Sequence, residues 1–344
     1  MKIKNNNVWK LFLLVFFLIL ICPFLLKLLF TAIGKEIYTF NLSFTDFINT
    51  WITLWSVFGA AIGLYLVQKK IDISRAQHSE QIKTQQEHLK IQIQEGYRVR
   101  YSNCIELLNN DNEIIRLQSI NNMYLLALEN PKDYLSIICN SFCDIITSKC
   151  KKYSQKEIQR VFKYLFVDEP RIFDQVRKDI NNCQLTNLMI TNAHINNTNL
   201  NNSIIDDCKI HNTKITNSNF IGTTLKKTVF RTTSFKNVIF RRAIMSDNTT
   251  FSRLTINGAL FNQSTLNSVF FDDVQISNSD FSDAKMMKSS LTNLKFVQCH
   301  LEFDDINDTR LIFVNHNYLN DFKKMLPSKY NKVLHIQGGV IYIP

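Results

Sequence analysis

The residues that most often perform chemistry occur in this 344-residue chain without the spacing that chemistry requires. Cys139, Cys143 and Cys150 lie close together in a predicted helical segment, and thiolates are common metal ligands. Because no histidine or fourth cysteine lies nearby, we predict that these thiols are buried by packing instead. The histidines of the polar second half are interpreted as solvated surface residues; they include His194, His211 and His300.

The sequence also lacks the signatures of common active sites. It contains no phosphate-binding glycine loop, no HExxH zinc motif and no GxSxG nucleophile motif. We therefore predict that the chain is not an enzyme and has no catalytic residue, metal, cofactor or small-molecule substrate. Eight cysteines would suit a disulfide-bonded secreted domain, but Cys183, Cys208 and Cys299 occupy one repeated position. We predict that they are reduced thiols of a cytosolic domain.

Charged side chains form two clusters of opposite sign. Between Cys208 and Ser246 there are eight basic residues and no acidic one, whereas from Asp272 to Asp308 eight acidic residues outnumber three lysines. A basic surface can attract nucleic acid or another polyanion, although an ordinary solvated surface would have the same composition. The candidate polyanion-binding residues are Lys226, Lys227, Arg231, Lys236, Arg241 and Arg242.

A period of five residues predicts how these side chains are positioned. Counting in fives from Leu185 to Met245 gives thirteen large apolar residues. After a one-residue insertion within residues 246–250, the count from Phe251 to Leu311 gives thirteen more. The residue two places before each of them is mostly small or a thiol. A period of five fits neither an α-helix nor an alternating strand, but it fits a square coil whose sides are single pentapeptides with the large residue inside.

These positions resemble the A-D/N-L-x-x pattern of the pentapeptide repeat family over residues 183–311. The resemblance implies a right-handed quadrilateral β-helix with four repeats per coil, roughly 30 Å long at about 4.8 Å per coil. Its ends would need caps, which we expect from residues 157–176 at one end and from residues 317–325 with residues 333–343 at the other. Successive sides of one coil would carry Lys226, Arg231, Lys236 and Arg241 as a basic belt. Some family members imitate DNA with a continuous acidic rod, and this belt speaks against that role.

Two apolar segments near the N-terminus are long enough to cross a bilayer. The first, residues 9–33, contains only Lys10 and Lys27 as charges, and the second, residues 48–68, contains none. A signal peptide is the alternative for the first segment, but its apolar core is too long and no cleavage site follows. Basic residues flank both ends of this hairpin. The positive-inside rule therefore predicts a multi-pass protein of the bacterial inner membrane with both termini in the cytosol.

Small residues gather on one face of the second apolar segment. Ser56, Gly59, Ala60 and Gly63 form a face with GxxxG spacing, which allows close approach of helix backbones. This candidate helix-packing face could drive homo-oligomerisation within the bilayer or pack against the first helix of the same hairpin. The GxxxG spacing does not choose between these alternatives.

A helical stalk and linker are predicted between the hairpin and the repeats. Residues 69–108 contain no proline, one glycine and many Gln, Glu and Lys residues, which predicts a long polar helix, either solvated alone or part of a short coiled coil. From Arg98 the sequence resembles a segment of bacterial membrane-anchored pentapeptide repeat proteins, with I-E-x-L followed by a spaced I/V-R-L-x-x-I pattern. Met123 and Ala127 depart from that pattern. The likeness concerns architecture and implies no activity.

The predicted organisation is a multidomain membrane protein with four parts: a transmembrane hairpin (1–70), a helical stalk and linker (71–182), the β-helix (183–311) and a C-terminal cap (312–344). Two classes of function fit it. In the first, the rod binds a cytosolic protein or nucleoprotein and controls a membrane-perturbing hairpin, in an architecture that resembles the two-helix effectors of bacterial anti-phage systems such as retrons. In the second, the protein is a passive membrane-anchored scaffold. The GxxxG face, the stalk and the basic surface together favour the effector.

Overall fold

The computed structural model describes residues 21, 44–148, 152–312, 316–326, 328, 335–337 and 340–343. Apart from Ile21, the predicted first membrane segment lies outside the described residues, as does Cys150. The chain divides into two compact units, one ending at Leu89 and one beginning at Lys90. Each unit is described by itself.

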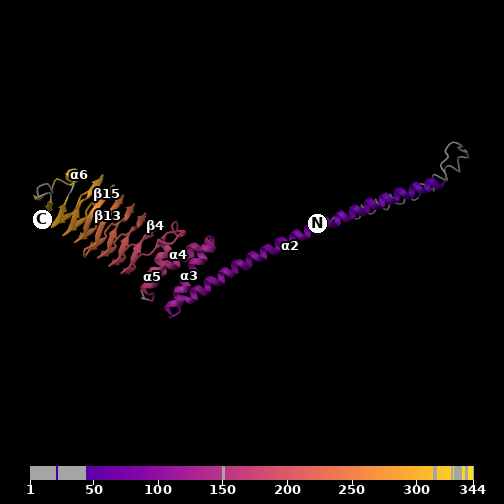
Figure 1. Ribbon diagram of the computed structural model, residues 1–344, viewed down its shortest axis with the longest axis horizontal. Coiled ribbons are helices and arrows are strands. Elements are labelled where there is room, and N and C mark those ends of the chain that lie inside the picture. Colours follow the sequence, from indigo (N-terminus) through magenta and orange to yellow (C-terminus); the bar gives the residue numbers. More distant parts are fainter. Residues whose placement is uncertain are drawn as a thin grey trace. The chain divides into compact units, whose positions relative to one another are not determined.

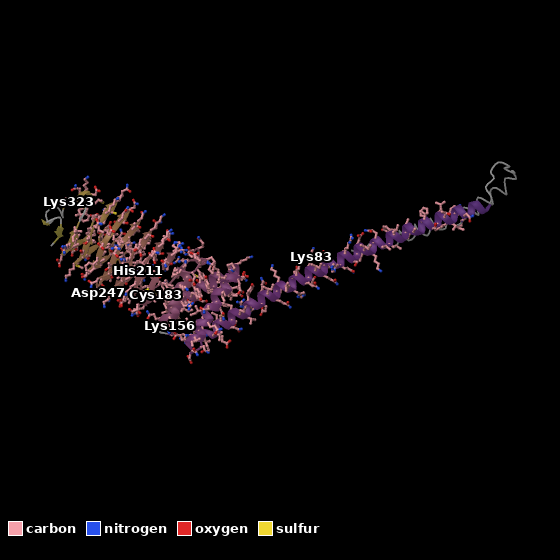
Figure 2. The ribbon with its side chains drawn as sticks, in the orientation of Figure 1. Lys83, Lys156, Cys183, His211, Asp247 and Lys323 are labelled. Carbon is pink, nitrogen blue, oxygen red and sulfur yellow. The ribbon has the colours of Figure 1, made fainter. Side chains whose placement is uncertain are left out.

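Helix α2, Phe44–Leu107, is a single helix of 64 residues (Figure 1). It contains both the second predicted membrane segment and the predicted stalk, and no proline interrupts its backbone hydrogen bonds. Among the described residues, this is the one helix that is long and apolar enough to cross a membrane. The predicted two-helix hairpin is therefore not confirmed. Residues 69–96 of the stalk are exposed, as Figure 2 shows around Lys83.

Three further helices form a bundle after α2, and the last turns of α2 contact the first two of them. The three helices are α3 (Glu113–Glu129), α4 (Pro131–Thr147) and α5 (Gln155–Phe166). The Asn112 side chain caps α3 by accepting a hydrogen bond from the Ile114 N–H, and Ser154 with Glu157 forms a capping box on α5. Both Cys139 and Cys143 are buried in the core of this bundle, which confirms the predicted packing role of these two thiols.

The repeats form a solenoid of short parallel strands. Its strands are β1 (Lys178–Asp179), β2 (Gln184–Thr186), β3 (Met189–Thr191), β4 (His194–Asn196), β5 (Thr198–Asn199), β6 (Ile204–Asp206), β7 (Lys209–His211), β8 (Lys214–Thr216), β9 (Thr224–Lys226), β10 (Val229–Arg231), β11 (Ser234–Lys236), β12 (Ile244–Ser246), β13 (Thr250–Asn257), β14 (Thr265–Asn267), β15 (Phe270–Ser277), β16 (Lys285–Met287), β17 (Ser290–Thr292), β18 (Lys295–Val297), β19 (Asp305–Asn307) and β20 (Thr309–Ile312). Residues 20 apart are ladder partners, for example Leu185 with Ile205, and the offset becomes 21 across the predicted insertion, where Met245 pairs with Leu266.

The predicted interior of the solenoid is confirmed at every position. All 26 large residues of the five-residue period are buried, each with at most 5% of its surface exposed. Phenylalanines one coil apart stack face to face, with ring centroids 4.9 Å apart for Phe251 and Phe271 and 4.6 Å apart for Phe261 and Phe281. The repeating interior therefore gains ordered aromatic stacking in addition to apolar burial.

The corners of the coils explain the abundance of asparagine and aspartate. The residue two places after most interior residues has a positive φ, between 48° and 58° where it is not glycine. Asparagine and aspartate adopt this left-handed region more readily than other residues with a side chain. Gly222 has a φ of 65°, and a β-carbon there would lie 2.5 Å from Asn202 Oδ1. A substitution at Gly222 would therefore be both strained and crowded.

Other elements pack against both ends of the solenoid. At the start, α5 packs beside β3 and β4, and the ladder begins at β1, one pentapeptide before residue 183. At the far end, Phe322 of α6 (His316–Met325) lies 5.4 Å from Phe296 between ring centroids. Strand β22 (Val340–Ile343) pairs antiparallel with β20, and β21 (His335–Gln337) pairs with β22. Figure 1 shows α5 and α6 at opposite ends of the stacked strands.

Candidate binding surfaces

The basic belt lies on one coil, with an exposed cation on each of its four sides. Side A, the ladder from β2 to β19, carries Lys226, and side B, the ladder from β3 to β20, carries Arg231. Side C, the ladder from β4 to β18, carries Lys236. Side D, the row of bridges from Asn199 to His300, carries Arg241. The structure thus places these four residues as the five-residue period predicted.

The surroundings of these cations differ from side to side. On side A, Lys226 is the ladder partner of Asp206, so a carboxylate lies one coil away. On sides B and C, the ladder partners of Arg231 and Lys236 carry no carboxylate; they are His211, Ser252, Thr216 and Asn257. On side D, Arg242 donates from Nε to Gln263 Oε1 at 3.0 Å. A carboxylate therefore lies beside the belt cation of side A but is not a ladder partner of the cations of sides B and C.

A groove of about 750 Å³ follows the corner between sides B and C. It crosses five coils, and the coil of the belt contributes Thr232, Thr233 and Ser234 to its wall. At about 4.8 Å per coil, the groove is roughly 20 Å long. Arg231 and Lys236 belong to the same coil and immediately flank this segment, so the belt and the groove meet at one corner.

Charged residues from other coils also line this groove. They are Lys214, Arg253 and Lys295, with one carboxylate, Asp273. Arg253 and Lys295 are not among the polyanion-binding residues predicted from the sequence, because they lie outside the basic segment between Cys208 and Ser246. Arg253 occupies a corner position with a φ of 50° and lies one coil from Asp273, whereas the ladder of side C brings Lys295 into register with Lys214. Aligning the outward-facing residues of successive coils would have identified both cations from the sequence.

The cysteine and histidine side chains of the repeats contact other residues of the fold. Burial raises the pKa of the Cys183 and Cys208 thiols to about 11, so both are neutral thiols at physiological pH. Among the described residues, no group of three His, Cys, Asp or Glu side chains is placed to hold a metal ion.

The interpretation of His194 as solvated is wrong, because its side chain is 17% exposed and its Nδ1 lies 2.8 Å from Asp174 Oδ2. His300 is exposed and lies beside Asp280 and Glu302.

The small-residue face of α2 is open in the structure. Ser56, Gly59, Ala60 and Gly63 are all exposed. A β-carbon added at Gly59 or Gly63 would meet no described atom within 4 Å outside the helix's own nearby backbone. The first predicted membrane helix lies outside the described residues, so both alternatives for this face stay open.

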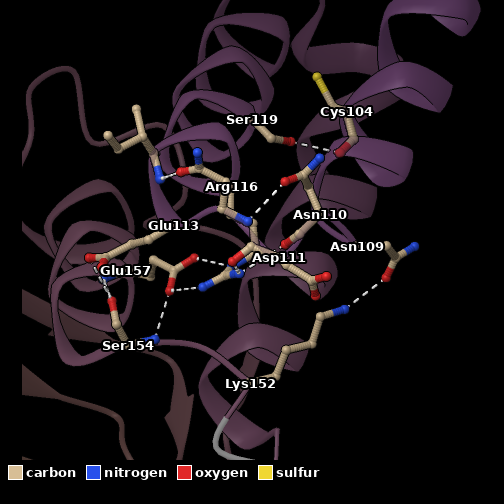
Figure 3. A network of polar contacts seen from close by, with 12 residues as sticks. Cys104, Asn109, Asn110, Asp111, Glu113, Arg116, Ser119, Lys152, Ser154 and Glu157 are labelled. Carbon is tan, nitrogen blue, oxygen red and sulfur yellow. Dashed lines mark hydrogen bonds and ion pairs between the residues drawn. The ribbon is translucent and has the colours of Figure 1, made fainter.

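A buried polar network fixes the end of α2 to α3 and α5 (Figure 3). Arg116 donates to both carboxylate oxygens of Glu157, at 2.7 and 3.2 Å, and from Nη1 to the carbonyls of Asn110 and Asp111, which follow α2. Glu157 also accepts from the Ser154 N–H at 2.6 Å. Burial opposes the charge of Glu157, but the hydrogen bonds from Arg116 and Ser154 outweigh it, so the pKa of Glu157 is lowered. The end of the stalk is therefore tied to the helix that caps the solenoid.

Comparison with known proteins supports the repeat assignment. The model of the family described as pentapeptide repeats matches residues 213–247 and 256–293, in eight copies. No curated protein matches the chain.

Solved structures with a similar fold include HetL, a pentapeptide repeat protein involved in heterocyst differentiation regulation in Nostoc sp. strain PCC 7120, at 15% identity and a TM-score of 0.22. That match covers 34% of this chain and 62% of HetL. Rfr23 of Cyanothece 51142 matches at 8% identity and a TM-score of 0.25, covering 36% of this chain and 89% of Rfr23. The plasmid-mediated fluoroquinolone resistance protein QnrB1 matches at 11% identity and a TM-score of 0.14, covering 41% and 93%.

Because these identities and TM-scores are low, nothing about the function of this chain follows from the three structures. The assignment rests on the family match together with the uninterrupted ladder of buried residues described above. Residues 213–247 and 256–293 are thus similar to pentapeptide repeats, and they lie within a β-solenoid of stacked parallel strands.

Proposed function

We propose that the chain is a non-enzymatic, membrane-anchored interaction protein whose cytosolic solenoid binds a polyanionic partner such as a nucleoprotein. One observation carries this proposal: the basic belt meets the groove between sides B and C, where Lys214, Arg253 and Lys295 add further cations. Phosphate groups of a nucleic acid release counterions when they contact such cations, which supplies affinity without sequence recognition. The hydroxyl and amide side chains of the groove can donate to the same phosphates.

Neutralising the corner should weaken polyanion binding. We expect the full-length triple variant Arg231→Gln, Lys236→Gln, Arg253→Gln to bind single-stranded or duplex nucleic acid at least about tenfold more weakly at low salt. Its plot of log affinity against log salt should be shallower by roughly 0.7–0.9 per lost phosphate contact, measured by fluorescence anisotropy. The matched control is Lys285→Gln, Lys288→Gln on side A, where Lys285 pairs with Asp304. Equal losses in both variants, or none in the triple variant, would refute a site at this corner.

The membrane part of the proposal rests on the composition of α2. Residues 48–68 are uncharged and Lys69 and Lys70 follow directly, which supports a span whose basic flank lies in the cytosol. In this arrangement the chain is anchored in the bacterial inner membrane and both termini are cytosolic. The ion pair between Arg116 and Glu157 joins the end of the stalk to the helix that caps the solenoid.

A narrower form of this function is a membrane-perturbing effector, as in anti-phage defence. The open small-residue face of α2 favours it, because an anchor alone needs no close-packing surface.

Overproduced wild-type chain with its partner supplied should then depolarise the membrane, and Gly59→Leu with Gly63→Leu should abolish depolarisation while the chain stays in the membrane fraction. Ala61→Leu, which lies toward the other side of α2, is the matched control. A wild type that leaves potential and growth unchanged would leave the passive scaffold as the function.

A further inference from the structure

Exposed isoleucines of α2 recur every eleven residues. Ile71, Ile82 and Ile93 are 40%, 41% and 49% exposed, although each is followed or preceded by polar residues. Eleven residues complete three helical turns at about 3.67 residues per turn, so these side chains lie on one nearly straight line along the helix. In the membrane segment the same line passes through Ala60.

Two further lines with the same period run beside this one. The second contains Ser56, Val67, His78 and Leu89, and the third contains Gly63, Ser74, Gln85 and Gly96. Ten charged residues lie between positions 69 and 98, and none of them falls on any of the three lines. We call the surface formed by the three lines the seam.

The unbroken course of α2 is what makes the seam one surface. Because the helix runs from Phe44 to Leu107 without interruption, the helical phase of the predicted membrane segment continues into the stalk (Figure 1). Ser56, Ala60 and Gly63, three of the four small residues of the predicted packing face, occupy the three lines of the seam. A β-carbon on Gly63 or Gly96 would meet no described atom within 4 Å outside the helix's own nearby backbone.

We propose that α2 pairs in parallel with α2 of a second copy of this chain along the seam. The inference rests on the proposed function, because two copies anchored in one membrane with the same topology present their helices in parallel. In that register each line of the seam packs against the same line of the second helix. Isoleucines therefore pack on isoleucines in the stalk, and small residues allow the two helices to approach closely in the bilayer. An eleven-residue repeat gives such a pair a right-handed supercoil.

The stalk positions directly beside the seam are mostly uncharged. Lys70, Gln81 and Gln92 lie along one side of it, and Arg75, Gln86 and Tyr97 lie along the other. The seam ends at Gly96, just before Arg100 and Tyr101 turn to Glu129 and Ser141 of the cap.

Cysteine cross-linking of the full-length chain in membranes tests the seam. Ile82→Cys and Leu89→Cys place thiols on it, whereas Ile73→Cys and Ile91→Cys place thiols on the opposite face at isoleucines that are 52% and 61% exposed. Two differently tagged copies are produced together, oxidised with copper phenanthroline and separated without reductant. We expect a band carrying both tags that is at least about fivefold stronger for the two seam variants than for the two control variants or the wild type, whose native cysteines set the background.

Each other outcome overturns the seam. Equal bands at both faces would show random collision, and no band at Ile82 or Leu89 would show that this face has another occupant or none. A cross-linked species that never carries the second tag after purification through the first would identify a different protein. A carbonate wash of the same membranes tests the membrane anchor independently of the seam. A chain lost from the washed membranes contradicts the membrane anchor, while the comparison between the two faces still judges the seam.

Discussion

Replacing Phe235 with aspartate is expected to disorder the solenoid around it. The Phe235 side chain is 1% exposed, and its ring centroid lies 5.3 Å from that of Phe230 and 5.7 Å from that of Phe240. Phe235→Asp removes these contacts and buries a carboxylate that has no hydrogen-bond donor. The loss of unfolding free energy should be about 4 kcal/mol or more. Urea unfolding of the detergent-solubilised full-length chain, followed by circular dichroism, measures it.

Two variants separate burial of the charge from other effects at this site. Phe235→Leu keeps an apolar side chain of smaller volume and should cost about 1–2 kcal/mol. Lys236→Asp introduces the same carboxylate one residue further on, where the side chain is exposed, and should change stability by less than about 0.5 kcal/mol. If Phe235→Asp unfolded at the same urea concentration as the wild type, the residue could not face the interior.

The interior of the solenoid was predictable because a single constraint repeats along it. Each pentapeptide must supply one large apolar residue and one small neighbour, so residues such as Phe235 and Thr233 could be assigned from spacing alone. Lys178 breaks this rule: it occupies the small position of the first rung and is fully buried. Its Nζ donates to the carbonyls of Val176 and Asn196 at 2.8 and 3.0 Å, and burial lowers its pKa. A pattern based on size cannot anticipate a lysine held by carbonyls at a capped end.

The candidate site was predictable only in part, because a surface depends on which coils lie beside each other. Arg231 and Lys236 were visible as a run of charge, but the carboxylate beside Lys226 lies twenty residues away in the sequence. Arg253 joins the groove only once the insertion within residues 246–250 shifts the register of the coil. His194 was read as solvated because its neighbour Asp174 comes from the linker, outside the repeating pattern.

Removing Arg116 should destabilise the cap strongly, because Glu157 would keep its buried position and lose its partner. Breaking a buried pair in this way costs about 3–5 kcal/mol, whereas Arg100→Ala, at the half-exposed pair with Glu129, should cost less than about 1 kcal/mol.

The pH dependence of this cost identifies the carboxylate. Because the folded pKa of Glu157 lies below its unfolded value, the wild type gains stability from this group above about pH 4.3 and loses it as pH falls through the folded pKa. The difference between wild type and Arg116→Ala should therefore be largest near neutral pH and shrink below about pH 4. Hydrogen exchange of α3 and α5 amides measures both effects. A pH-independent difference would assign the loss to packing of the arginine side chain, and Arg116→Met with Glu157→Leu should restore most of the stability if the unpaired charge is the cause.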